Sequence, residues 1–139
     1  MGLGKAAEIA DKTMEETARK VLALRQRLHS RITEKIEYVR LNGHPEKRLP
    51  NTLNISFRNV DASSLLNKLK DKIAFSLGAA CHDKERSLSP VLKAMGVEED
   101  YGFGAVRLSL GKFNTVEEID FAVELMTEAV NSLRAAPRR

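Results

Sequence analysis

Two side chains of this sequence are suited by type and position to chemistry, a single cysteine and an arginine inside an apolar strand. Cys81 follows the small residues 78–80, so little neighbouring bulk shields its sulfur. Arg107 stands between Val106 and Leu108, where a guanidinium needs either solvent or an anion. We therefore consider a thiol nucleophile and a carboxylate anchor, and weigh a structural alternative for each.

The surroundings of Cys81 give a mixed signal about thiol reactivity. His82 and two further cations close by favour the thiolate, whereas Asp83 and Glu85 oppose it. A lone cysteine in a cytosolic protein is also commonly a small buried hydrophobe. The three histidines and the cysteine do not show the spacing of metal ligands; they are His29, His44, His82 and Cys81. A nucleophile and a core residue both remain open for Cys81, and a metal site is not expected.

Alternation along the strand around Arg107 places its side chain on the face opposite Val106 and Leu108. A planar guanidinium there could hold a substrate carboxylate through two parallel hydrogen bonds. The alternative is a solvent-exposed arginine on an open sheet face. Three glycines bracket this strand, Gly102, Gly104 and Gly111. They either permit close backbone approach or form turns.

A long amphipathic helix is expected over residues 5–35. Apolar or small residues recur there at steps of three and four, at positions 6, 9, 10, 14, 17, 18, 21, 24, 28 and 32. Such a length is unusual in a domain of this size. We expect the helix to bridge two domains or to pack along a partner.

The rest of the chain mixes strands with helices. Strands are predicted over 37–41, 52–57, 73–76 and 105–110, and helices after Asp61, over 90–95 with Ser89 as cap, and after the capping box of Thr115 and Glu118. Because strands and helices do not alternate strictly, the fold class predicted is α+β. We expect a small, mainly antiparallel sheet of about four strands covered by helices on one face.

Composition indicates one soluble globular domain. The 139 residues are 42% hydrophobic and 30% charged, with a net charge of +4. One cysteine excludes an internal disulfide, and no apolar run approaches the roughly 20 residues of a membrane span. No signal peptide and no basic–aromatic platform for nucleic acid is evident. We expect a cytoplasmic protein that binds neither membrane nor nucleic acid.

Several collinear segments resemble one family, the NifS-like cysteine desulfurases and selenocysteine lyases of the class V aminotransferase group. The segments are residues 2–8, 48–57, 78–82, 89–96 and 106–120. The match at 78–82 resembles the loop that carries the family's catalytic cysteine, and the match at 106–120 resembles its C-terminal signature. The resemblance covers essentially the whole chain.

The resemblance implies the small C-terminal domain of a fold-type I enzyme that depends on pyridoxal phosphate. Such enzymes remove sulfur or selenium from cysteine or selenocysteine and leave alanine. By this resemblance Cys81 is the nucleophile and Arg107 binds the substrate carboxylate. Residues 1–35 then link to an absent large domain, and residues 36–139 form the small domain.

The family's large domain would precede residue 1, and with it the lysine that binds the cofactor. Lys5, Lys72 and Lys93 match no cofactor-lysine motif. Lys112 and Asn114 also stand where the family more often has arginine and threonine. We therefore expect this chain alone to bind no pyridoxal phosphate and to be inactive as a lyase.

Two other functions remain open at this point. The chain could be a persulfide carrier in which Cys81 holds sulfur or selenium for an acceptor protein. It could instead be an interaction domain whose long helix packs on a partner and which self-associates. The partners expected are therefore a large domain or a second copy of the chain, and an acceptor protein.

Overall fold

The computed structural model describes residues 2–77 and 88–136. Its elements follow in the order α1 (Gly2–Lys35), β1 (Val39–Leu41), β2 (Thr52–Phe57), α2 (Ala62–Leu69), β3 (Ser76–Leu77), α3 (Pro90–Ala94), α4 (Glu99–Gly102), β4 (Ala105–Ser109) and α5 (Val116–Ala135). The four strands form one antiparallel sheet in the order β1-β2-β4-β3. The predicted α+β class is confirmed, with its long N-terminal helix and four-stranded sheet.

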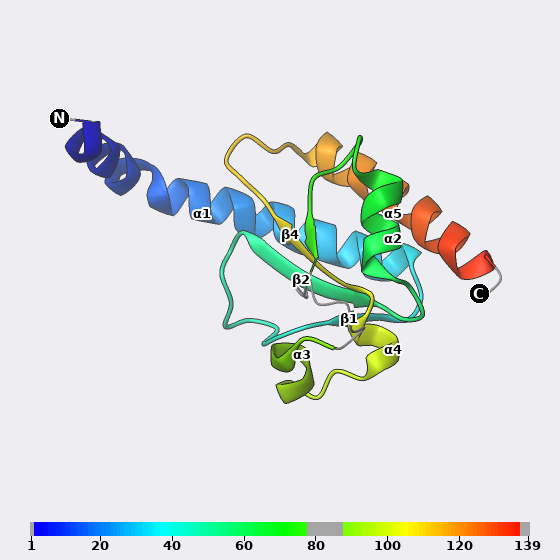
Figure 1. Ribbon diagram of the computed structural model, residues 1–139. Coiled ribbons are helices and arrows are strands. Elements are labelled where there is room, and N and C mark those ends of the chain that lie inside the picture. Colours follow the sequence, from blue (N-terminus) through cyan, green and yellow to red (C-terminus); the bar gives the residue numbers. More distant parts are fainter. Residues whose placement is uncertain (1, 78–87, 137–139) are drawn as a thin grey trace.

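One face of the sheet builds the hydrophobic core. Leu53, Ile55 and Phe57 of β2 are fully buried, and Val106 and Leu108 of β4 join them. The helices α1, α2 and α5 lie against this face (Figure 1). Alternation along the strands turns the remaining side chains to the opposite face, which α3 and α4 cover only near Ala105.

The two halves of α1 have different surroundings. Val21, Leu24, Leu28 and Ile32 are buried in the core. The apolar positions of the first half are not buried, and Met14 keeps 63% of its surface exposed. In Figure 1 this half projects beyond the rest of the molecule. The apolar stripe of α1 therefore continues for about four helical turns beyond the part of the helix that packs on the core.

The third strand differs from its prediction. The expected strand over 73–76 is instead a two-residue strand, Ser76–Leu77, paired with β4. The backbone N–H groups of Lys72 and Ile73 both donate to the Leu69 carbonyl, which extends the turn at the end of α2. Ile73 and Phe75 still pack against the core. The spacing of these two apolar residues therefore reflects packing against the core and not strand pairing.

Two short helices connect β3 to β4. The first, α3, begins at Pro90 as expected and ends one residue earlier than predicted. Ser89 occupies the N-cap position as predicted, but its buried side chain makes no capping hydrogen bond with the described residues. Gly96 ends the helix with φ +66°, a backbone conformation that favours glycine. The second, α4, was not predicted, since its four residues are too few to show a helical period.

The capping box at the start of α5 is confirmed. The Glu118 backbone N–H donates to Thr115 Oγ1 at 3.3 Å, and the Thr115 N–H donates to Glu118 Oε2 at 3.1 Å. A hydrogen bond from Asn114, and after it the bond from the Thr115 N–H, lower the pKa of the Glu118 carboxyl.

Replacing Thr115 by alanine is expected to lower the free energy of unfolding by about 1 kcal/mol, because the cap bond to the helix is lost. Urea denaturation followed by circular dichroism measures the change. Thr33→Ala serves as the control, since Thr33 lies exposed inside α1 and bonds only carbonyls one turn back among its described neighbours. Equal stability of the two variants would contradict this role for the cap.

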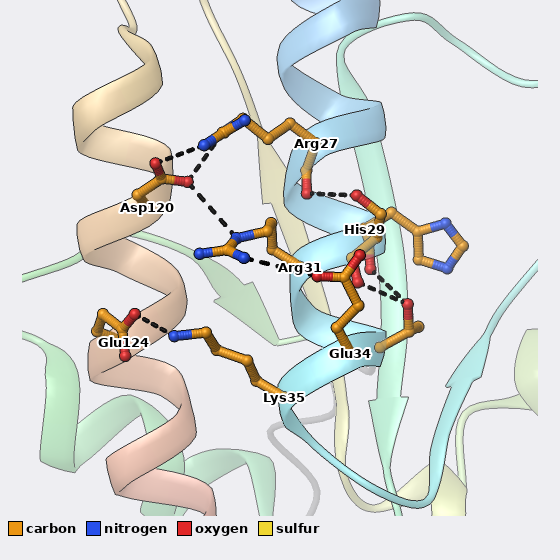
Figure 2. A network of polar contacts seen from close by, with 9 residues as sticks. Arg27, His29, Arg31, Glu34, Lys35, Asp120 and Glu124 are labelled. Atoms are coloured by element: carbon orange, nitrogen blue, oxygen red, sulfur yellow. Dashed lines mark hydrogen bonds and ion pairs between the residues drawn. The ribbon is translucent and has the colours of Figure 1, made fainter.

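Charged side chains join α1 to α5 along their exposed edge (Figure 2). Arg27 binds Asp120 through two hydrogen bonds of 2.8 and 2.7 Å, and Lys35 pairs with Glu124. The Arg27 guanidinium lowers the pKa of the Asp120 carboxyl. Exposed pairs of this kind each contribute about 1 kcal/mol at most. They fix how the helices are oriented more than they stabilise the fold.

Candidate functional site

Arg107 occupies the middle of β4 on the sheet face opposite the core. Its backbone pairs with Asn54 of β2 on one side and with Ser76 of β3 on the other. The side chain is exposed and forms no hydrogen bond or ion pair with the residues that the structure describes. Its placement on the open face agrees with the sequence pattern, and its role as a carboxylate anchor stays a prediction.

A buried amide network lies next to Arg107 on the same face. Asn42 Nδ2 donates to Asn54 Oδ1 at 2.9 Å and to Ser56 Oγ at 2.8 Å. The backbone N–H of Asn42 also donates to the Asn54 carbonyl at 3.0 Å. Both Asn42 and Ser56 are buried, whereas Asn54 is half-buried beside Arg107.

The predicted nucleophile lies outside the described residues. Cys81 and its neighbours His82, Lys84 and Arg86 belong to the segment 78–87. The chain enters this segment from β3 and leaves it before α3. Because Ser76 of β3 pairs with Arg107, the segment begins two residues from the arginine's cross-strand partner. The nucleophilic role of Cys81 stays a prediction.

A cluster of cations lies where α1 meets the connection from β1 to β2. Arg25 is 97% buried, and its Nη1 donates to the Leu49 carbonyl at 2.8 Å. Burial, then Arg48 and then Arg25, lower the pKa of the nearby His29 imidazole. Burial and Arg25 likewise lower the pKa of Arg48. This cluster anchors the connecting loop to the helix at an electrostatic cost.

His29 should make the fold less stable in mild acid. The unfolded imidazole has a pKa of about 6.5, and the folded value is lower, so below pH 6.5 the unfolded chain binds a proton that the folded chain excludes. The free energy of unfolding then falls as the pH falls. We expect His29→Gln to lose less stability than the parent chain between about pH 7.5 and about pH 5.5 in urea titrations. An unchanged loss would contradict the account.

An apolar groove runs along the projecting half of α1. It has a volume of about 610 Å³, and its floor consists mainly of apolar and small side chains. Ile9, Met14 and Val21 of the helix line one side, and Pro50 and Leu110 lie among the residues on the other. Ile9 and Met14 are 47% and 63% exposed. Exposed apolar patches on proteins commonly mark interaction surfaces or ligand-binding grooves.

The described residues do not fit a Schiff-base site for pyridoxal phosphate. Such a lysine needs a desolvated pocket. Every lysine within 2–77 and 88–136 except Lys35 is exposed, and half-buried Lys35 pairs with Glu124.

Within the same ranges, no three His, Cys, Asp or Glu side chains are grouped to hold a metal ion. None of the helices in the described part is long and apolar enough to cross a membrane.

Comparison with known proteins decides the family. The profile of the family described as "Aminotransferase class-V" matches residues 1–121. The chain belongs to the class-V aminotransferase family. This confirms the resemblance first suggested by the segments around Cys81 and Arg107.

Relatives of this class-V chain are cysteine desulfurases. The "Cysteine desulfurase IscS" of Anaeromyxobacter dehalogenans (strain 2CP-C) is 41% identical over 134 residues, which cover 96% of this chain and 33% of the relative. The IscS of Methanosarcina thermophila is 43% identical over 135 residues, with the same two coverages. The chain therefore spans about a third of the length of the relatives that it matches.

Solved structures agree with this class-V assignment. A "NifS-like protein" from Rickettsia africae ESF-5 superposes with a TM-score of 0.79 at 29% identity, over 94% of this chain and 33% of the other. A second NifS-like protein gives a TM-score of 0.76 at 33% identity, over 92% of this chain and 32% of the other. The fold is thus that of one third of a NifS-like chain.

Sequence reasoning missed the amide network and the cation cluster. Asn54 and Ser56 occupy the polar positions of a strand whose alternation was recognised, so their shared face could have been inferred. Nothing in the spacing pointed to Asn42, which is twelve residues away from Asn54. Arg25 sits on the apolar stripe of α1, next to Leu24, and a charged residue at that position was the available signal.

Proposed function

We propose that this chain supplies the substrate-carboxylate anchor and the sulfur-accepting thiol of a cysteine desulfurase or selenocysteine lyase. The family assignment and the exposed position of Arg107 on the open sheet face support this function. A guanidinium without a partner among the described residues is free to bind a carboxylate bidentately. Arg107 would thus hold cysteine or selenocysteine by its α-carboxylate.

The reaction assigned to the Cys81 thiol needs a further group that stabilises the electron pair left on the substrate carbon. The Cys81 thiolate forms a bond to the substrate sulfur, and the substrate Cβ–S bond breaks with its electron pair remaining on carbon. That carbon takes up a proton to give alanine, and Cys81 is left as a persulfide. The electron pair on carbon needs stabilisation, which pyridoxal phosphate supplies in such enzymes when it is bound. The described lysines offer no site for it, so we assign it to a large domain.

The groove on α1 is the proposed docking site for that large domain. The relatives carry about twice the length of this chain in addition to the matched third, and the apolar pattern of α1 continues beyond the core. The occupant proposed is therefore the large domain of a class-V aminotransferase, either in the same polypeptide or as a separate subunit. Burying Ile9 and Met14 there would remove apolar surface from water.

Co-purification tests this docking. The chain is co-expressed with a tagged large domain made from the non-matching part of the Anaeromyxobacter relative. We expect the parent chain to be retained, and the double variant Ile9→Glu, Met14→Glu to be lost. Gln26→Glu is the control, because it places a carboxylate at an exposed position on the same helix outside the groove. Retention of the double variant would contradict the proposed site.

Mass spectrometry tests the role of Cys81. The chain fused after that large domain is loaded with pyridoxal phosphate and incubated with L-cysteine. We expect one additional sulfur atom on the peptide that contains Cys81, removable by a reducing agent, and none in the Cys81→Ser variant. Alanine production without sulfur on Cys81 would show that the thiol is not the acceptor.

A further inference from the structure

Asn54 stands directly across the strand pair from Arg107. The two residues are Cα partners in the register of β2 and β4, so their side chains emerge on the same face. Directly opposed residues of an antiparallel pair have Cβ atoms about 5 Å apart. A carboxylate bound by the guanidinium of Arg107 would therefore lie within reach of the carboxamide of Asn54.

The hydrogen bonds of Asn54 decide which end of its carboxamide is free. Its Oδ1 accepts from Asn42 Nδ2 at 2.9 Å, while its Nδ2 has no acceptor among the residues that the structure describes. An amide NH₂ offers two donors and no acceptor. The end of Asn54 left open on this half-buried position is therefore a donor that complements an anion.

Asn42 holds this orientation in place. Its NH₂ group serves two acceptors, Asn54 Oδ1 and the buried Ser56 Oγ, and its backbone N–H binds the Asn54 carbonyl. Its own Oδ1 is buried without a partner in the described structure. Turning both amides over would instead leave the two N–H donors of the buried Asn42 unpaired. The observed orientation of the two amides leaves only the Asn42 Oδ1 acceptor unpaired, whereas the turned orientation leaves two Asn42 donors unpaired. The observed orientation is therefore favoured over the turned one.

We infer that Asn54 is a second anion donor at the carboxylate site of Arg107, and that Asn42 is the positioning residue that fixes the Asn54 carboxamide. The inference rests on the proposed function of Arg107 as a carboxylate anchor. The site then offers the fork of the guanidinium and one amide N–H from the neighbouring strand. A carboxylate has enough lone pairs to accept all three hydrogen bonds.

A nuclear magnetic resonance titration of the ¹⁵N-labelled chain tests the inference without cofactor or activity. Acetate is the probe, added at constant ionic strength against chloride. We expect the Arg107 Nε–H and the Asn54 Nδ2 signals to shift together with one dissociation constant. Asn54→Asp keeps the shape and the acceptor for Asn42 but removes the donor, and should weaken acetate binding by about tenfold or more. Asn67→Asp is the control, an equal charge change at an exposed position of α2.

Asn42→Ala should leave acetate bound by Arg107 but about threefold more weakly, and should move the two Asn54 Nδ2 proton signals towards those of a solvent-exposed asparagine, because Asn42 no longer holds the carboxamide. Shifts at Arg107 without shifts at Asn54 would overturn the inference and leave the proposed anchor standing. Absence of shifts at both residues would overturn both. A fall in affinity for Asn67→Asp equal to that of Asn54→Asp would also overturn the inference, since net charge would then explain the effect.

Discussion

Gly104→Ala is expected to lower the free energy of unfolding by about 3 kcal/mol or more, the largest stability effect of any small substitution near the site. A Cβ atom at Gly104 would lie 2.0 Å from the Phe57 carbonyl oxygen and 3.0 Å from the Val60 carbonyl oxygen. Both neighbours are backbone atoms, so no side-chain rotation can relieve the clash. The Gly104 carbonyl also accepts the Phe57 N–H at 3.1 Å, which holds the two segments together.

Urea denaturation of Gly104→Ala and Gly111→Ala measures the free energy of unfolding of both variants. The comparison separates the effect of the close backbone contact at Gly104 from the general effect of replacing a glycine by alanine. A Cβ at Gly111 would meet only Asn114 Oδ1 among the described atoms, at an ordinary contact distance of 4.0 Å. We expect this control to change stability by less than about 1 kcal/mol. Similar losses in the two variants would contradict the packing account of β4.

Arg107→Gln should lower kcat/KM for L-cysteine by about 100-fold or more in the chain fused to a large domain. The change removes a charged, bidentate partner of the substrate carboxylate, and each hydrogen bond to a charged group is worth about 1.5–3 kcal/mol. Arg107→Lys should recover only part of the loss, because an ammonium cannot form the parallel pair.

Steady-state alanine formation measures this effect, and unfolding of each variant is checked by circular dichroism. Arg19→Gln is the matched control, since Arg19 is exposed on α1 and lies outside the groove. Because Arg107 is exposed on the open face, its replacement should not lower stability appreciably. A folded Arg107→Gln enzyme with parental kcat/KM would contradict the anchor.

Local sequence signals predicted most of the fold. The bounds of β2 and the capping box at Thr115 follow from alternation and from residue types that act over a few positions. The strand prediction was wrong at residues 73–75 because Ile73 and Phe75 are partly buried there without strand pairing, and alternation reports burial alone. The helix α4 was not predicted because its four residues span little more than one helical turn, too few for apolar residues to recur at helical spacing.

The candidate site was only partly readable in the sequence. The face and exposure of Arg107 followed from its apolar neighbours, because alternation in a strand is a local rule. The glycines around β4 left turns and close approach equally open, since the Phe57 carbonyl that crowds Gly104 is distant in sequence. The Asn42–Asn54 bond likewise depends on how β1 and β2 pair.

Alanine formation from L-cysteine, measured for the isolated chain and for the chain fused after the large domain of the Anaeromyxobacter relative, tests the central claim most directly. Both proteins are assayed with added pyridoxal phosphate. The fusion is predicted to release alanine and the isolated chain to release none. Alanine release by the isolated chain, or none from a folded fusion that has bound pyridoxal phosphate, would contradict the claim that this chain is one part of a cysteine desulfurase active site.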